Sequence, residues 1–247
     1  MIPKKPKPTE PVTEPMTEPV TKPGTEPTTE PTTEPTTDPT TEPGIKTVQK
    51  PVKKGDKVTD DKKTGKYIVT DTKKRTVTYM SPYKKKSKNI KVSSYVKIRK
   101  KTYRVTAIYK NAFKNNRYVT KVTIGDSVTS IGANAFSGAS KLKNVTIGKN
   151  VISIGSSAFK RCDSLVTITL PDKLVKIGAY SFSGCKKLKT ITIKSQKMTS
   201  KTISDNAFKG LTGVTSVKVP KKSLEAYKKL FKRKGLSSGT AKIRFWM

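Results

Sequence analysis

The sequence predicts a repeat solenoid, a right-handed stack of short parallel β-strands joined by turns and small helical segments. Three observations support this fold class: a unit of 23 residues recurs, each unit carries the same short strand pattern, and each carries a phenylalanine at the same place. The segment Asn144–Cys162 nearly repeats Lys121–Ala139, and Thr167–Cys185 repeats it again. Because one such unit cannot bury its few apolar residues alone, neighbouring units must stack to build a continuous core.

The chain is expected to begin with an extended spacer over residues 1–44. Proline recurs at every fourth position from Pro11 to Pro43, within Thr-Glu-Pro tetrapeptides. Proline removes amide donors and fixes φ near the polyproline value, and the segment has almost nothing apolar to bury. We therefore expect a disordered, semi-rigid spacer. Residues 45–65 are interpreted as a second, basic linker, with order beginning near Lys66.

Residues 66–104 are predicted to form an N-terminal β cap. The segments "KYIVTD" and "RTVTYM" alternate apolar and polar residues, which is the period of a strand. Asn89–Val96 has the phase of Lys121–Val128, and the segment Lys97–Arg104 is inserted after it. This insertion indicates a degenerate first repeat that carries a hairpin.

Residues 105–220 contain five repeats, each with a leading strand of the pattern apolar-x-x-apolar-x-apolar. A second short extended piece follows, and it ends at the isoleucines Ile108, Ile131, Ile154, Ile177 and Ile203. The phenylalanines come next, in phase with one another: Phe113, Phe136, Phe159, Phe182 and Phe208. Stacking should align each residue with its equivalents, and Gly132, Gly155 and Gly178 should form tight corners after the second strand.

Residues 221–247 are predicted to form a C-terminal cap. Ser223 is placed to cap a helix and Gly235 to end it. The apolar residues at helical spacing are Leu224, Tyr227, Leu230 and Phe231. We expect this helix to cover the open edge of the last strand, which would prevent end-to-end association. The alternative is that a basic amphipathic helix binds a membrane surface.

Together these units resemble the BspA-like bacterial leucine-rich-repeat family. The likeness rests on the pattern "LxxVTIGxxVTSIGxxAFxGC", which is five-fold and in phase over about residues 105–220. The asparagine typical of the wider class stands at Asn150, whereas Ser127 and Lys173 take its place in neighbouring repeats. The resemblance implies an extracellular adhesion or binding protein of bacteria, and it names no ligand.

The composition argues against an enzyme. The 247-residue chain has no histidine, which removes the commonest general base and metal ligand. Its 17 acidic residues are scattered, and the chain contains no Walker loop, no GxGxxG and no CxxC. We therefore expect no catalysis, no cofactor and no metal site.

The charge is strongly positive, with 53 basic residues, a net charge of +36, and an even more basic remainder once the acidic spacer is set aside. Such a body should attract polyanions, among them nucleic acid, anionic cell-wall polymers, acidic glycans and anionic lipid. The alternative is a solvated lysine surface that keeps a repeat protein dissolved. No apolar run is long enough to span a bilayer, and the start lacks the apolar region of a signal peptide. Because the spacer is typical of displayed proteins, we expect a fragment of a longer chain located outside the cell or on its surface.

The leading strands predict a candidate binding face. The residues that flank the buried positions should point outward, and they are Lys121, Thr123, Asn144, Thr146, Thr167, Thr169, Thr190 and Thr192. Repeat proteins commonly bind ligands along such a surface, although threonine also simply favours strands. Further contacts are expected from Tyr83, Tyr95 and Tyr103 near the hairpin.

Two cysteines occupy the same place in successive repeats, since Cys162 and Cys185 are 23 residues apart. Their spacing allows either a disulfide or two buried thiols that fill a packing position.

Three functional hypotheses follow. The first is a monomeric, non-enzymatic module displayed on the cell surface that binds a surface or host protein or a glycan. The second is a basic protein that binds anionic cell-wall polymer or nucleic acid. The third is a passive structural spacer.

Overall fold

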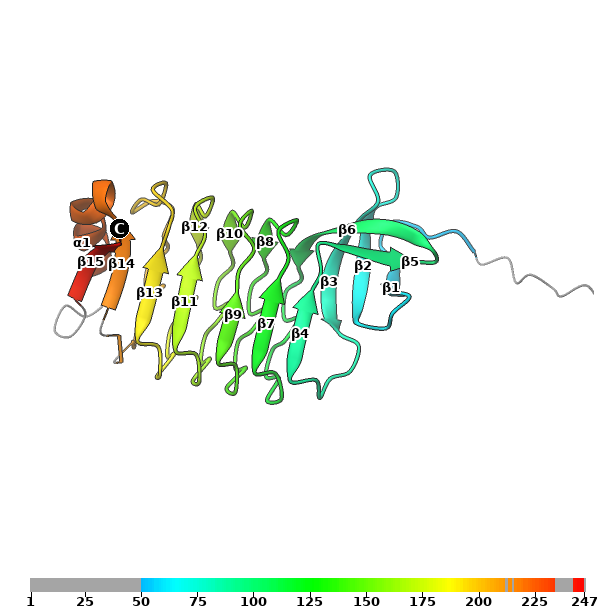
Figure 1. The fold of residues 1–247 in the computed structure, drawn as a ribbon, viewed down its shortest axis with the longest axis horizontal. Coiled ribbons are helices and arrows are strands. Elements are labelled where there is room, and N and C mark those ends of the chain that lie inside the picture. The colour runs from blue at the N-terminus through cyan, green and yellow to red at the C-terminus, as the bar shows by residue number, and fades with distance from the viewer. Residues whose placement is uncertain (1–49, 212, 215, 234–241, 247) are drawn as a thin grey trace, which may run out of the picture. The chain divides into compact units, whose positions relative to one another are not determined.

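A computed structural model describes residues 50–211, 213–214, 216–233 and 242–246 (Figure 1). The chain divides into residues 1–47 and 48–247, and all described residues belong to the second unit. The predicted spacer, residues 1–44, lies outside the described residues. Strands make up most of the regular secondary structure of the described part, and one α-helix lies near its C-terminal end. None of its helices is long and apolar enough to cross a membrane.

The repeats stack through their leading strands. These strands are β4 (Asn89–Val92), β7 (Lys121–Ile124), β9 (Asn144–Thr146), β11 (Thr167–Leu170), β13 (Thr190–Ile193) and β14 (Ser216–Pro220). β4, β7 and β9 form one parallel sheet, and β11, β13 and β14 belong to another (Figure 1). Pairing joins equivalent residues of successive repeats, such as Val122 with Val145 and Ile168 with Ile191. Each strand therefore buries the same positions as its neighbour and directs the alternate ones outward.

A second set of short strands carries the isoleucine ladder. It comprises β6 (Lys101–Ile108), β8 (Ser130–Ile131), β10 (Ser153–Ile154) and β12 (Lys176–Ile177). Successive members pair in parallel, with the isoleucine that ends each strand in register with the next. Ile203 joins the ladder through an isolated bridge to Ile177. All these isoleucines are buried, which confirms the predicted ladder.

A column of stacked phenylalanines runs through the core. The ring centroids of Phe113 and Phe136 are 4.7 Å apart, and those of Phe182 and Phe208 are 5.6 Å apart. Tyr79 stacks on Phe113 at one end of the column with a centroid distance of 5.6 Å. Because each buried aromatic ring removes a large apolar area from water, this column is a main source of the packing energy between repeats.

Each repeat turns through two backbone positions in the left-handed region. The first position has φ between 54° and 63° and is occupied by Asn111, Asn134, Ser157, Tyr180 and Asn206. The second is occupied by Asn115, Gly138, Arg161, Gly184 and Gly210. Asparagine and glycine recur here because they adopt this conformation at the lowest cost.

Gly155 has a different role from the predicted tight corner. An added Cβ at this residue would lie 2.6 Å from the amide nitrogen of Ala133. An added Cβ at Gly178 would likewise lie 2.4 Å from the amide nitrogen of Ser156. The close approach of adjacent coils therefore requires glycine after the second strand.

The N-terminal cap extends the sheet of second strands. β1 (Lys57–Thr59), β2 (Gly65–Asp71) and β3 (Thr76–Pro82) pair antiparallel, and β3 pairs in parallel with β6. β5 (Tyr95–Ile98) and β6 form the predicted hairpin. Its turn residues Arg99 and Lys100 have φ of 50° and 63°, as expected for a tight turn that matches the twist of the strands.

Order begins earlier than the predicted boundary near Lys66. β1 lies inside the predicted linker, residues 45–65, and pairs Val58 with Tyr67 of β2. Val58 also packs against the main core, and Val52 does the same. The linker interpretation missed these contacts because single valines among lysines give no periodic signal in the sequence.

The C-terminal cap contains a short 3-10 helix (Lys221–Ser223), α1 (Leu224–Arg233) and β15 (Lys242–Trp246). The predicted apolar stripe is confirmed, because Tyr227, Leu230 and Phe231 are buried. The ring of Phe231 packs edge-on against that of Phe208, with a centroid distance of 5.2 Å. Helix α1 therefore covers the end of the phenylalanine column.

The predicted role of the helix at the strand edge needs correction. β15 pairs in parallel with β14 and so covers the edge that the helix was expected to cover (Figure 1). Ser223, the predicted cap residue, lies in the 3-10 helix directly before α1. Gly235, the predicted stop, lies outside the described residues.

Candidate functional site

The eight residues predicted to face outward lie on four consecutive leading strands, β7, β9, β11 and β13, and we call this surface the threonine face. Five of them are exposed, namely Lys121, Asn144, Thr146, Thr167 and Thr169, and three are half-buried, namely Thr123, Thr190 and Thr192. Each alternates with a buried aliphatic residue of the same strand. The outward orientation follows from strand geometry, and binding by this face stays a prediction.

The threonine face consists of two halves that are each in register. Thr167 pairs with Thr190, and Lys121 pairs with Asn144. β9 and β11 belong to different sheets, and β9 is one residue shorter than its neighbours. The surface therefore presents six threonine hydroxyl groups, the amide of Asn144 and the ammonium group of Lys121, all of which can form hydrogen bonds with a ligand.

The first leading strand extends this surface beyond the predicted residues. Asn89 and Lys91 of β4 are exposed and lie in register with Lys121 and Thr123 of β7. The sequence signal for these two residues was the shared phase of Asn89–Val96 and Lys121–Val128, and the predicted binding face did not include them.

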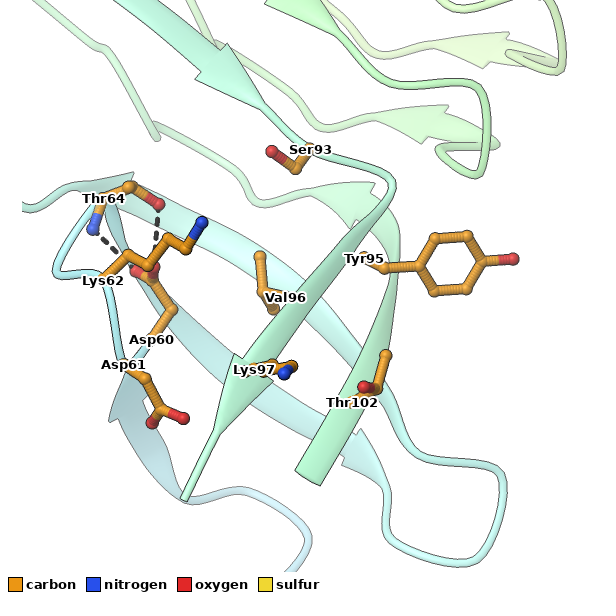
Figure 2. Close-up of a pocket in the computed structure, with 9 residues that line it drawn as sticks. All are labelled: Asp60, Asp61, Lys62, Thr64, Ser93, Tyr95, Val96, Lys97 and Thr102. Carbon is orange, nitrogen blue, oxygen red and sulfur yellow. Dashed lines mark hydrogen bonds between the residues drawn. The ribbon is translucent and has the colours of Figure 1, made fainter. Parts of the chain in front are cut away.

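A cavity of about 450 Å³ lies in the N-terminal cap, between the loop that follows β1 and the hairpin (Figure 2). Asp60 is almost fully buried there and accepts hydrogen bonds from the amides of Thr64 and Gly65, at 2.8 and 2.7 Å. Asp61 accepts hydrogen bonds from the amides of Arg99 and Lys100, at 2.8 and 2.9 Å. Both carboxylates therefore hold the loop backbone in place, and this structural role explains why they are found here.

The tyrosines expected near the hairpin differ in accessibility. Tyr95 is 60% exposed and points away from Asp60 and Thr64 in Figure 2, and Tyr83 is 37% exposed. Tyr103 is only 4% exposed, so its predicted role as a surface contact is wrong. It lies on the same side of β6 as buried Val105, because residues two apart in a strand share a face.

Exposed tyrosines also occur among the repeats, where the sequence reasoning did not place them. Tyr118 is 48% exposed before β7, and Tyr180 is 38% exposed at a left-handed corner. The ammonium group of Lys160 lies 5.7 Å from the centre of the Tyr180 ring. The sequence could have indicated Tyr180, because three equivalent positions carry asparagine.

Cys162 and Cys185 are free, buried thiols, so the packing interpretation holds and the disulfide does not form. The thiol of Cys162 donates to the carbonyl oxygen of Phe136 at 3.2 Å, and that of Cys185 donates to Phe159 at 3.1 Å. Burial raises the pKa of the Cys185 thiol to about 12 and raises the pKa of Cys162 as well. Since the thiolate is the reactive form, these cysteines are chemically inert in the folded protein.

The described residues contain no group of three or more cysteine, aspartate or glutamate side chains that could hold a metal ion.

Comparison with known families supports the sequence resemblance. A family model described as "BspA type Leucine rich repeat region" matches residues 106–237 in 6 copies. The match extends past the predicted repeat region, which ended at residue 220, into the C-terminal cap. No curated protein matches the sequence.

Several solved bacterial structures are similar to this chain. A leucine-rich repeat protein of T. pallidum is 25% identical, with a TM-score of 0.56 over 65% of this chain and 71% of that protein. The pneumococcal vaccine antigen PcpA is 23% identical, with a TM-score of 0.57 over 78% of this chain and 47% of that protein. A leucine-rich repeat protein from Bacteroides capillosus is 28% identical, with a TM-score of 0.48 over 53% of this chain and 94% of that protein.

Proposed function

Because the chain belongs to the BspA-type leucine-rich repeat family, we propose that it is a non-catalytic binding module displayed outside a bacterial cell. Its ligand is a surface or host protein or a glycan, bound along the threonine face. The proposal also includes that the repeats form a right-handed solenoid, that the protein is a monomer, and that residues 1–44 form a proline-rich stalk. The stalk composition and the resemblance to extracellular family members support this location.

The observation that carries the proposal is the in-register outward row of the leading strands. Thr169 of β11 pairs in register with Thr192 of β13, and each alternates along its strand with buried residues that form the core. Their side chains therefore lie outside the core that packs the repeats together. Extended surfaces of this kind are what repeat proteins use to contact ligands.

The chemistry of the described residues favours binding over catalysis. Asp60 and Asp61 serve backbone amides, and the two cysteines are buried as thiols. A general base or nucleophile needs a titratable group within reach of a substrate. Hydrogen-bonding hydroxyls on a flat sheet provide no such group.

Charge supports a second candidate function, the binding of a polyanion. The net charge of +36 comes from 53 basic residues, and the described ion pairs, Lys149 with Asp126 and Lys228 with Glu225, involve few of them. Long-range attraction to an anionic polymer follows from this excess. Such binding would weaken steeply with salt, whereas recognition by the threonine face would persist.

The test is a triple substitution, Thr146→Glu, Thr169→Glu and Thr192→Glu. The protein is first applied to an array of purified extracellular proteins and glycans at high salt, and the strongest salt-resistant binder is then titrated. We expect the triple variant to lose at least about tenfold in affinity, because three charges now line the face. Its melting temperature should remain close to that of the wild type.

The matched control carries three glutamates elsewhere, as Thr72→Glu, Ser156→Glu and Ser200→Glu, all at exposed positions. This variant has the same net charge and should bind normally. If both variants lose affinity equally, or if no binding survives high salt, the threonine face is not the site and the polyanion hypothesis replaces it.

A further inference from the structure

We propose that a second site, separate from the threonine face, binds the anionic groups of a linear polysaccharide. This corner pocket is a cavity of about 530 Å³ lined by residues of three successive repeats. Its charged lining residues are Arg117, Lys160, Arg161 and Asp163.

The shape of the corner pocket follows from residue size. The middle repeat contributes the small residues Ser137, Gly138 and Ser140 to the lining. The repeats on either side have long side chains at the equivalent positions, with Arg117 on one side and Lys160 and Arg161 on the other. The backbone of Arg161, with φ of 57°, is left-handed like that of Gly138 at the equivalent position of the middle repeat.

The corner pocket carries a net positive charge. Three cationic side chains line it against the single carboxylate of Asp163. Within the described residues, Arg117, Lys160 and Arg161 form no ion pair with any carboxylate. Arginine and lysine side chains in this arrangement can bind sulfate or carboxylate groups, and arginine can do so through two parallel hydrogen bonds.

The polar lining favours a carbohydrate as the carrier of those anionic groups. Asn134 and Ser157 add an amide and a hydroxyl beside the cations, and sugar hydroxyls can hydrogen-bond to both. A single-stranded nucleic acid would need open aromatic rings for base stacking. None of the described residues that line the corner pocket is aromatic.

The charges also recur along the repeats, which favours a linear polymer. Lys114, Lys160 and Lys209 occupy equivalent positions on alternate repeats, and serine stands on the repeats between them. Positions two coils apart are separated by roughly 10 Å at the usual spacing of parallel strands. A polymer that runs along the stack therefore meets a new cation at regular intervals on leaving the corner pocket.

The test replaces the cations with the residues of the neighbouring repeats, as Lys160→Ser with Arg161→Gly. This variant should fold, because Ser137 with Gly138 and Ser183 with Gly184 occupy the same corner in adjacent coils. The control, Lys141→Ser with Lys143→Thr, removes the same charge from exposed positions outside the pocket. Affinity is measured for a heparin oligosaccharide, a hyaluronan oligosaccharide of equal length and single-stranded DNA, each over a salt series.

We expect the corner-pocket variant to lose roughly tenfold in heparin affinity near physiological salt, with a shallower salt dependence, and the control to lose less than about threefold. Asp163→Asn should strengthen binding, because it removes the opposing charge. A selective loss for heparin alone assigns sulfate as the recognised group, and a parallel loss for hyaluronan assigns carboxylate. Equal losses in the two charge variants, or a larger pocket-specific loss for DNA, would overturn the proposal.

Discussion

At the scale of single residues, the phenylalanine column shows how a one-dimensional repeat becomes a packed core. Phe159 lies between Phe136 and Phe182, with ring centroids 5.0 and 5.3 Å away and ring planes nearly parallel. Its side chain is fully buried. Each inner ring is therefore packed by the repeats on both sides, and the two end rings are packed by Tyr79 and Phe231 of the caps.

We predict that Phe159→Ala lowers the free energy of unfolding by roughly 3–5 kcal/mol, because it leaves a cavity that the neighbouring rings cannot fill. Urea denaturation followed by circular dichroism measures the change. Tyr118→Ala is the control, since it deletes an aromatic ring that is 48% exposed, and it should cost less than about 1 kcal/mol. A loss below about 1 kcal/mol for Phe159→Ala would show that the column is not the core.

At the scale of secondary-structure elements, the two ends of the stack are closed by different means. The N-terminal end is continued by antiparallel strands, and β1 and β2 extend the sheet beyond β3. At the C-terminal end, α1 covers the aromatic column while β15 pairs with β14. The hydroxyl of Tyr227 anchors the helix by donating to the carbonyl oxygen of Ser195 at 2.8 Å.

We predict that removing residues 234–247 causes self-association, because the edge of β14 then presents unpaired amides and carbonyls. Light scattering coupled to size-exclusion chromatography should show concentration-dependent oligomers of the shortened chain. The full chain at the same concentrations is the control and should remain monomeric. A shortened chain that stays monomeric and folded would mean that β15 is not what protects this edge.

At the scale of the whole molecule, the charge opposes folding while it promotes binding. A net charge of +36 makes the compact state repel itself. The described cations on the surface of the repeats mostly face solvent, where added salt screens them. Stability and polyanion affinity should therefore respond to salt in opposite directions.

We predict that the melting temperature rises by several degrees between about 10 mM and 500 mM sodium chloride, since the screening length shortens from about 30 Å to below 8 Å. Differential scanning fluorimetry in sodium chloride and in potassium chloride separates screening from a specific effect of one cation. A melting temperature that is flat or falls with salt would show that charge repulsion is not an important term.

Much of the fold could be predicted from the sequence. The repeat of 23 residues indicated which isoleucines and phenylalanines would stack, and the structure confirms both ladders. The hairpin was also predictable, because the segment Lys97–Arg104 interrupts an otherwise regular phase. These features are local or periodic, and a periodic pattern places each residue against its equivalent once the strands pair in parallel.

The outward orientation of the threonine face was predictable for the same reason, since side chains alternate along a strand. The extension by Asn89 and Lys91 needed the register of β4 with β7, which the structure supplies. Tyr103 was misjudged because an inserted hairpin has no repeat to show which of its faces is buried.

What the sequence determined by itself was the repeat, the identity of the stacked residues, the charge and the family. The tertiary structure alone decided that order starts before Lys66, that β15 rather than the helix covers β14, and that Arg117 meets Lys160 and Arg161 in one pocket. The first two depend on contacts between segments that share no periodic pattern, and the third depends on long side chains that depart from the small residues of the repeat between them. Such contacts are set by how backbone and side chains fit in space, and a short segment carries too little signal to specify its distant partner.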